Sequence, residues 1–164
     1  MAKSDEVYSG CGTVLPAPTN TKESFASSAP ATGQPVLGLL ISVNLVNFFD
    51  FAGGQEYYEV RNEFYSDAQG ALLVFDVSSK ATLDALSNWL KEGEQHGMRA
   101  PAMMLCGNKT DNKKREVSEA DARRWAGAHG GMAYYETSAK DGDNVHKMFD
   151  KLFADAAKSA YKSK

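Results

Sequence analysis

Three short polar motifs along this chain each follow a short apolar run. The motifs are Asp-Phe-Ala-Gly at residues 50–53, Asn-Lys-Thr-Asp at residues 108–111 and Glu-Thr-Ser-Ala-Lys at residues 136–140. Apolar runs of this length are typical of strands buried in a sheet. Ligands of open α/β sheets bind in the crevice outside the carboxyl ends of the strands. The pattern therefore predicts an α/β fold in which these three motifs line one ligand site.

The apolar runs themselves predict a mostly parallel sheet. Residues 70–77 are almost continuously apolar, as expected of a parallel strand that is buried on both faces. The runs at 101–107 and 132–136 predict two further strands that lie side by side and parallel. Residues 36–49 are also strand material, for one long strand or for two. We therefore expect a three-layer α/β sandwich with a mostly parallel sheet, from about residue 36 to residue 160.

Apolar side chains at helical spacing predict three helices packed on this sheet. Ser79 is placed to cap the first helix, and Ser118, with Asp121 three residues later, is placed to cap the second. The third helix begins near residue 143 or 144. We interpret the apolar stripes of these helices as core and not as a cofactor site.

The two ends of the chain differ in composition from the body between them. Residues 1–35 are rich in Pro, Thr, Ser, Ala and Gly, above all from residue 13 onward. This composition predicts a low-complexity, disordered extension. Residues 161–164 form a short tail.

Taken together, the three motifs resemble those of the small GTPases. In that family Asn-Lys-x-Asp and Ser-Ala-Lys contact the guanine base, and Asp-x-x-Gly begins the segment called switch II. Residues 58–65, Tyr-Glu-Val-Arg-Asn-Glu-Phe-Tyr, resemble switch II of the Rab-like GTPases of the RJL type, some of which carry a DnaJ domain. The resemblance covers roughly residues 43–155. It implies a Ras-like P-loop NTPase fold, GTP and GDP as ligands, Mg²⁺ as cofactor, and effector or regulator proteins that bind switch II.

The residue types of the second and third motifs suit a guanine base. The Asp111 carboxylate can accept two parallel hydrogen bonds from N1 and the exocyclic amine of guanine, whereas adenine offers no such pair of donors. By resemblance, Lys109 lays its aliphatic stem along the base and ribose. Asn108 braces the neighbouring loops, and the backbone amide of Ala139 reaches the guanine oxygen.

The resemblance also assigns a role to each residue of the expected site. Asp50 is expected to hold Mg²⁺ through a water molecule. The residues expected to bind the nucleotide are Asn108, Lys109, Asp111, Ser138, Ala139, Lys140 and Gly53.

The phosphate-binding half of a small GTPase is missing from this chain. The family opens with a strand, a phosphate loop and a helix, and the loop reads Gly-x-x-x-x-Gly-Lys-Ser/Thr. The glycine-rich residues 10–13 are not followed by Gly-Lys-Ser/Thr, and Lys22 is preceded by Thr21. The threonine of switch I cannot be placed either. We therefore expect a sheet that is incomplete at its N-terminal part, where residues 36–42 could fill part of the place of the missing strand.

The catalytic position of switch II also departs from the family. Many small GTPases read Asp-x-x-Gly-Gln, and the glutamine orients the attacking water. Here Gly54 follows Gly53, and Gln55 lies one place later. Glycine has no side chain to orient a water, so no catalytic residue is assigned. Gln55 is the alternative candidate, and it is otherwise a solvated loop residue.

Charge and cysteine usage narrow the classes of partner and location. The net charge of −3 argues against nucleic acid as a partner. Cys11 and Cys106 lie far apart, so neither a disulfide framework nor a metal site is expected. We expect no secretory signal, no transmembrane helix, no prenylation motif and no stable membrane anchor. We therefore expect the chain to be a monomer located in the cytoplasm, with the nucleus or the cilium as alternative locations.

Three functional hypotheses remain open. In the first, which the resemblance favours, the chain is a GTP/GDP-binding molecular switch with slow hydrolysis, in signalling or in vesicle or ciliary trafficking. In the second, it is a pseudo-GTPase without enzymatic activity that keeps the fold as an interaction module. In the third, it is a truncated form that folds poorly and cannot bind nucleotide tightly.

Overall fold

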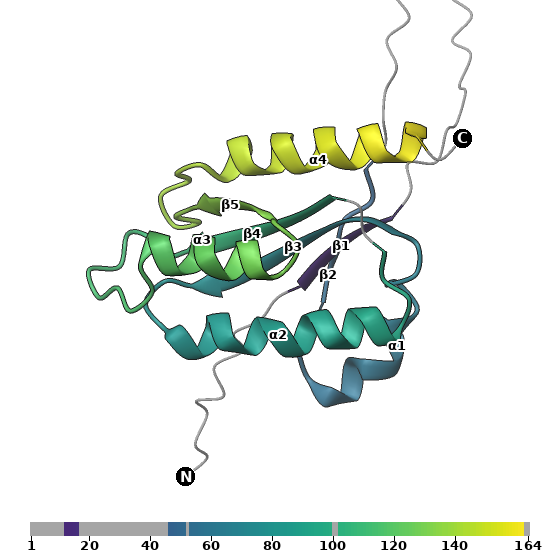
Figure 1. Ribbon diagram of the computed structural model, residues 1–164, viewed down its shortest axis with the longest axis horizontal. Coiled ribbons are helices and arrows are strands. Elements are labelled where there is room, and N and C mark those ends of the chain that lie inside the picture. The colour runs from purple at the N-terminus through teal and green to yellow at the C-terminus, as the bar shows by residue number, and fades with distance from the viewer. Residues whose placement is uncertain (1–11, 17–45, 52, 100–101, 163–164) are drawn as a thin grey trace, which may run out of the picture.

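Five strands form one sheet in the computed structural model, which describes residues 12–16, 46–51, 53–99 and 102–162. The strand order is β2–β1–β3–β4–β5 (Figure 1). The strands are β1 Gly12–Pro16, β2 Phe49–Asp50, β3 Ala68–Asp76, β4 Ala102–Asn108 and β5 Ala133–Glu136. β3, β4 and β5 are parallel, with Leu105 of β4 opposite both Leu73 and Tyr134. The prediction of parallel neighbouring strands at 101–107 and 132–136 is confirmed.

Helices cover both faces of this sheet. They are the 3₁₀ turn η1 Gln55–Tyr57, α1 Tyr58–Asn62, α2 Lys80–Gln95, α3 Glu119–Ala128 and α4 Val145–Lys162. α2 and α3 pack on one face of the sheet and α4 packs on the other (Figure 1). The predicted three-layer α/β sandwich is therefore confirmed. None of the described helices combines the length and the apolar character needed to cross a membrane.

Side chains of the parallel strands alternate between two cores, because successive residues of a strand point to opposite faces. On one face, Leu73 and Phe75 of β3 and Leu105 of β4 pack against α2 and α3. On the other face, Leu72 of β3 and Met104 of β4 pack against α4. Each fully buried side chain of this size contributes roughly 1.5–3 kcal/mol by leaving water. β3 and β4 therefore hold both helical layers in place.

β1 is the largest departure from the sequence prediction. Residues 12–16, which the composition assigns to a disordered extension, form the strand between β2 and β3. Residues 36–42, the sequence-based candidate for part of the place beside β3, lie outside the described residues, and that expectation stays a prediction. Residues 1–11 and 17–45 lie outside the described residues. Within residues 46–51, which were expected to be largely strand, only β2 is strand.

The direction of β1 is also unexpected, since the sheet was predicted to be mostly parallel. Thr13 lies opposite Leu72 of β3 and opposite Asp50 of β2, and both pairings are antiparallel. An unpaired strand edge presents a row of free N–H and C=O groups that another segment can satisfy in either direction. Backbone hydrogen bonding to the open edge of β3 therefore explains why this segment is ordered.

The helix ends agree only in part with the sequence prediction. The Ser118 hydroxyl accepts a hydrogen bond from the backbone N–H of Asp121 at 3.1 Å, which confirms the predicted cap of α3. Ser79 occupies the cap position of α2, but its side chain makes no capping hydrogen bond, so that prediction is wrong. At this helix end the buried Thr82 hydroxyl donates a hydrogen bond to the backbone carbonyl of Ser79 at 2.7 Å. α4 begins at Val145, near the predicted start, and continues two residues into the predicted tail.

Gly107 in β4 tests how tightly this core is packed. A Cβ atom at Gly107 would lie 2.6 Å from the Tyr134 hydroxyl and 3.0 Å from side-chain carbons of Phe75 and Val77. We expect Gly107→Ala to lower the free energy of unfolding by about 1–3 kcal/mol, because overpacking displaces these neighbours. Gly127→Ala is the control, since nothing lies within 4 Å of its Cβ position and alanine favours the helix. Equal urea midpoints for the two variants would contradict the prediction.

Candidate functional site

The carboxyl ends of β3, β4 and β5 lie at one edge of the sheet and carry two of the three motifs. In the parallel register Asp76, the last residue of β3, lies opposite Asn108, the last residue of β4. Two backbone hydrogen bonds join the loops that follow β4 and β5. Thr137 N–H donates to the Gly107 carbonyl at 2.9 Å, and Thr110 N–H donates to the Thr137 carbonyl at 3.1 Å. The motifs at 108–111 and 136–140 therefore lie side by side.

Asn108 holds these two loops together through its side chain. Its Oδ1 accepts hydrogen bonds from the Thr137 hydroxyl at 3.1 Å and from the backbone N–H of Ala139 at 3.0 Å. One amide oxygen thus satisfies two donors from the neighbouring loop, which matches the bracing role expected of this residue. The resemblance assigns the backbone amide of Ala139 to the guanine oxygen. In this structure that amide donates to Asn108 instead.

Asp111 lies at the centre of the contacts between the two motifs. Its Oδ1 accepts a hydrogen bond from the buried Ser138 hydroxyl at 2.9 Å. Lys140 Nζ lies 3.7 Å from Oδ2 of the same carboxylate. The Ser138 hydroxyl in turn accepts from the backbone N–H of Asp141 at 3.1 Å, which fixes the turn after β5. The carboxylate is therefore oriented by the third motif, and its side chain is only 20% exposed.

Lys109 adopts a left-handed backbone conformation, with φ of 67°, and its side chain reaches the end of the next strand. Its Nζ lies 2.6 Å from Oδ2 of Asp76. The other oxygen of Asp76 accepts hydrogen bonds from the Ser78 backbone N–H at 2.8 Å and the Ser78 hydroxyl at 2.6 Å. Partial burial favours a raised pKa for Asp76, but the hydrogen bonds from Lys109 and Ser78 hold that pKa below its usual value. The lysine stem therefore spans the edge from β4 to β3.

Asp76 is a site residue that the sequence interpretation missed. It was included in the apolar run 70–77 as strand, although a carboxylate that ends a buried strand was a signal available in the sequence. Charged side chains are almost never buried unless they are paired. That rule, applied to Asp76, would have pointed to a cationic partner at the same edge.

Asp50, the expected Mg²⁺ residue, lies away from this edge. The register through Thr13 places Asp50 level with Leu72, and β1 lies between β2 and β3. Leu72 precedes the end of β3 by four residues, about 13 Å along the strand. The first motif is therefore not brought into contact with the other two through the sheet.

The described residues do not fit a Mg²⁺ site. Mg²⁺ needs near-octahedral oxygen ligands, commonly carboxylates together with substrate phosphates. Within the described ranges, no group of three His, Cys, Asp or Glu side chains is placed to hold a metal ion. Nor does the chain contain the Gly-Lys-Ser/Thr whose hydroxyl would serve as a ligand. Gly53 and Gln55, the remaining switch II candidates, are exposed at the start of η1.

β1 enters the sheet in the direction opposite to the one that a phosphate loop requires. Such a loop follows the carboxyl end of a strand and opens a helix, at the same edge as the other ligand-binding loops. Pro16, the last residue of β1, lies opposite Ala68, the first residue of β3. The carboxyl end of β1 therefore lies at the edge of the sheet away from Asn108 and Asp111.

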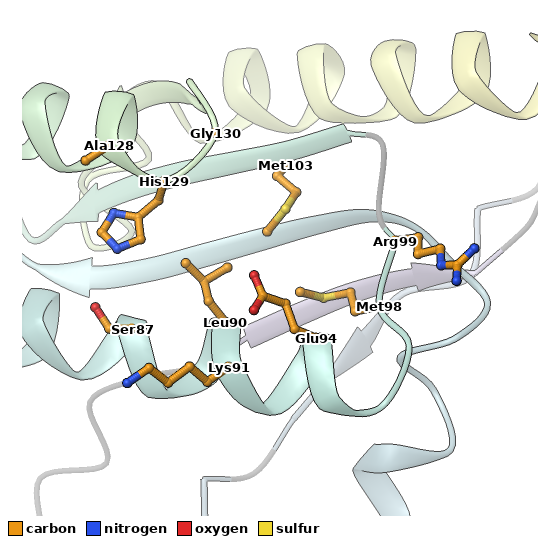
Figure 2. A pocket seen from close by; sticks show the side chains of 10 residues that line it. All are labelled: Ser87, Leu90, Lys91, Glu94, Met98, Arg99, Met103, Ala128, His129 and Gly130. Atoms are coloured by element: carbon orange, nitrogen blue, oxygen red, sulfur yellow. The ribbon is translucent and has the colours of Figure 1, made fainter.

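A separate pocket of about 520 Å³ lies between α2, the carboxyl end of α3 and the amino end of β4 (Figure 2). Leu90, Met98 and Met103 point toward one another inside it, and Lys91 and Glu94 lie along α2 beside them (Figure 2). None of the three motifs contributes a lining residue. The pocket is therefore distinct from the site that the motifs form.

Comparison with known proteins identifies relatives of this chain. The sequence model of the Ras family matches residues 41–158. Proteins named DnaJ homolog subfamily C member 27 are similar: 44% identical over 115 residues in Danio rerio, 45% over 115 in Gallus gallus and 46% over 114 in Homo sapiens. Each alignment covers 66% of this chain and 41% or 42% of the relative. The chain thus spans about two-fifths of the length of these curated relatives.

The family match agrees with the fold and with the motifs at the sheet edge. It covers well over half of the chain, including every described strand and helix from β2 to β5 and most of α4. The predicted resemblance to Rab-like small GTPases is confirmed. Family membership implies guanine nucleotides and Mg²⁺ as ligands by resemblance. This chain belongs to the Ras family, as a Rab-like member of the Ras superfamily.

Proposed function

We propose that this chain recognises the base of guanine nucleotides through the loops that follow β4 and β5. The observation that carries the proposal is the orientation of the Asp111 carboxylate by Ser138 at 2.9 Å. A carboxylate oxygen has more than one acceptor site, so Oδ1 and Oδ2 can both accept further donors. N1 and the exocyclic amine of guanine are such a pair of donors, and hydrogen bonds to an ionised acceptor are among the strong ones.

The neighbouring residues supply the rest of the proposed base site. Lys109, tethered to Asp76 at 2.6 Å, offers its aliphatic stem to the base and ribose. Asn108 keeps the loop that contains Ala139 against the loop that contains Asp111. For the Ala139 amide to reach the guanine oxygen, its hydrogen bond to Asn108 has to be shared or exchanged. Ser138 and Lys140 act on the carboxylate, and Gly53 belongs to the nucleotide site by resemblance alone.

Tight binding and hydrolysis are not part of the proposal for this polypeptide. Small GTPases hold nucleotide through phosphate-loop amides, a lysine and Mg²⁺ acting together. Each charge-assisted hydrogen bond is worth roughly 1.5–3 kcal/mol, so the loss of several costs about 5 kcal/mol or more. That loss corresponds to a few thousand-fold in affinity. The antiparallel direction of β1 supports this part of the proposal, because its carboxyl end lies at the far edge.

The proposal extends to a role in signalling or in vesicle or ciliary trafficking. Effector or regulator proteins would bind the surface of η1 and α1, where Tyr57 and Val60 are 50% and 60% exposed. Large apolar side chains that remain exposed are typical of protein-binding surfaces when they lie together. We propose that the chain does this as a monomer in the cytoplasm, without a nucleic-acid partner.

A second candidate function is that of an interaction module without enzymatic activity. It is favoured by the strand order, because β1 completes the sheet without building a phosphate loop at the site edge. In that case the function is to bind other proteins through the exposed face of α1, and base recognition has no role in it. The two candidates differ in whether guanine nucleotides bind at all.

Base selectivity tests the role of Asp111 directly. The parent chain is expected to prefer guanine over adenine and xanthine nucleotides. Asp111→Asn is expected to prefer xanthine, because an amide can donate to the xanthine C2 oxygen and still accept from N1–H. Competition against a fluorescent guanine nucleotide measures the preference of the parent chain, and competition against a fluorescent xanthine nucleotide measures that of Asp111→Asn. Equal competition by ATP and GTP on the parent chain would refute the assignment.

The affinities for GDP and for guanosine test whether the base, and not the phosphates, provides most of the binding free energy. Isothermal titration of the purified chain with GDP and Mg²⁺ is expected to give a micromolar or weaker Kd. Guanosine, which has no phosphate, is expected to bind within about tenfold of GDP, because one order of magnitude corresponds to only about 1.4 kcal/mol. Asp111→Ala serves as the control and should abolish both interactions. A nanomolar Kd for GDP, or GDP binding that survives Asp111→Ala, would contradict the proposal.

Replacing the residue after Gly53 tests the catalytic deficit. Gly54→Gln is sterically accessible, because the three atoms nearest to the added Cβ, at 2.5–2.6 Å, belong to the flexible carboxylate end of Glu56. The backbone of Gly54 is extended, with φ of −63°, so glutamine fits without strain. We still expect negligible GTP turnover, because a positioned water needs positioned phosphates and metal. Phosphate release by Gly54→Gln well above that of the parent would contradict this expectation.

A further inference from the structure

Arg61 of α1 is buried and binds both α2 and the loop that follows Gly53. Its side chain is 6% exposed, and its Nε and one terminal nitrogen donate to the two carboxylate oxygens of Glu92 at 2.5 and 2.9 Å. The other terminal nitrogen donates to the carbonyl of Gly54 at 2.7 Å. One guanidinium group therefore joins the carboxyl-terminal part of α2 to the first turn of the switch II segment.

Aromatic side chains enclose this ion pair. The guanidinium carbon of Arg61 lies 5.3 Å from the centroid of the Tyr58 ring and 5.0 Å from that of Trp89. The Tyr65 hydroxyl donates to Glu92 at 2.8 Å, so the carboxylate is bound from two directions. These rings shield the pair in part from water, which strengthens its electrostatic attraction.

Two further contacts hold the ends of the same segment. The Tyr58 hydroxyl and His96 Nε2 lie 2.8 Å apart at the carboxyl end of α2. The rings of Tyr65 and Phe51 pack edge to face, with their centroids 5.7 Å apart, and Phe51 directly follows β2. The segment from Gly54 to Tyr65 is therefore attached to α2 through Tyr58, Arg61 and Tyr65, and α1 lies beside α2 in the fold (Figure 1).

The ionisation state of Glu92 suits this arrangement. Partial burial favours a raised pKa for Glu92, but the hydrogen bonds from Arg61 and Tyr65 and the charge of Arg61 hold that pKa below its usual value. The carboxylate thus stays ionised at neutral pH and remains a bidentate partner for Arg61. Removing one member of this part-buried pair leaves the other without its partner, which weakens the attachment of α1 to α2.

We infer that the Arg61–Glu92 pair is a clamp that fixes the switch II segment, residues 54–65, in one conformation regardless of the nucleotide state. The consequence is regulatory: the exposed face of α1 is presented to partner proteins constitutively. The inference goes beyond the proposed function, because the contacts that make the clamp do not involve a nucleotide.

The energetics of conformational switching support the inference. A ligand can shift a conformational equilibrium only by the difference in its affinity for the two states. Switch segments respond to nucleotide when γ-phosphate and Mg²⁺ contacts order them. Here the ordering contacts come from Glu92, Trp89 and His96 of α2 and its end. A weakly bound nucleotide has little differential affinity with which to open this part-buried ion pair.

Hydrogen–deuterium exchange of the full chain without nucleotide tests the clamp. In Glu92→Gln, amides of residues 54–65 are expected to exchange at least tenfold faster than in the parent, while β4 and α4 change less than twofold. Glu94→Gln is the matched control, because Glu94 is an exposed carboxylate of the same helix without an ion pair among the described residues. It should leave exchange unchanged. Unchanged exchange at 54–65 in Glu92→Gln, or a uniform increase throughout the chain, would overturn the clamp.

Tyr65→Phe provides a second, milder variant if Glu92→Gln does not fold. It removes one donor to Glu92 and keeps the ring against Phe51. It is expected to raise exchange at residues 54–65 severalfold, with β4 and α4 unchanged. Exchange at residues 54–65 equal to that of the parent would count against the clamp.

Exchange measured with bound nucleotide tests whether residues 54–65 keep the same conformation in both nucleotide states. The parent chain is measured with GDP and with a non-hydrolysable GTP analogue, both with Mg²⁺ and at concentrations that calorimetry shows to be saturating. Exchange at residues 54–65 is expected to agree within twofold between the two. A difference above fivefold would overturn the inference. If calorimetry detects no binding, the proposed function fails, and the Glu92→Gln result still decides the clamp.

Discussion

The parallel pairing of β3 with β4 is the constraint on which the rest of the structure depends. The register runs from Gly70 opposite Ala102 to Asp76 opposite Asn108 without a break. A slip of one residue would turn the apolar side chains of one strand to the wrong faces, so two helical layers enforce this register. The same register places the Asp76 carboxylate within reach of Lys109. Core packing and site geometry are therefore consequences of one alignment.

Most of the body of the fold was predictable because its signals are local. Apolar runs identify the buried strands, helical spacing identifies α2, α3 and α4, and Ser118 with Asp121 marks the start of α3. The adjacency of the 108–111 and 136–140 motifs also follows from parallel strands that end at one edge. Their cross-links, such as Asn108 to Ala139, follow from that adjacency.

The remainder was not predictable from local patterns. Arg61 and Glu92 are 31 residues apart, and neither position carries a signal for the other until α1 lies beside α2. β1 is a stronger case, since the composition around residues 12–16 favours disorder while the open edge of β3 favours pairing. Tertiary context routinely overrides strand propensity in this way. The direction of β1 is decided by the available edge, and composition does not encode it.

The contacts between the two loops at the carboxyl ends of β4 and β5 are independent of the strand that lies beside β3. They are internal to these loops: Thr137 to Gly107, Ala139 to Asn108, and Ser138 to Asp111. None of these contacts involves β1, so they do not depend on which segment lies beside β3 or in which direction it runs. A loop that follows the neighbouring strand does depend on that direction, because only a strand parallel to β3 ends at this edge. The antiparallel β1 therefore leaves the contacts between the two loops intact and ends at the opposite edge.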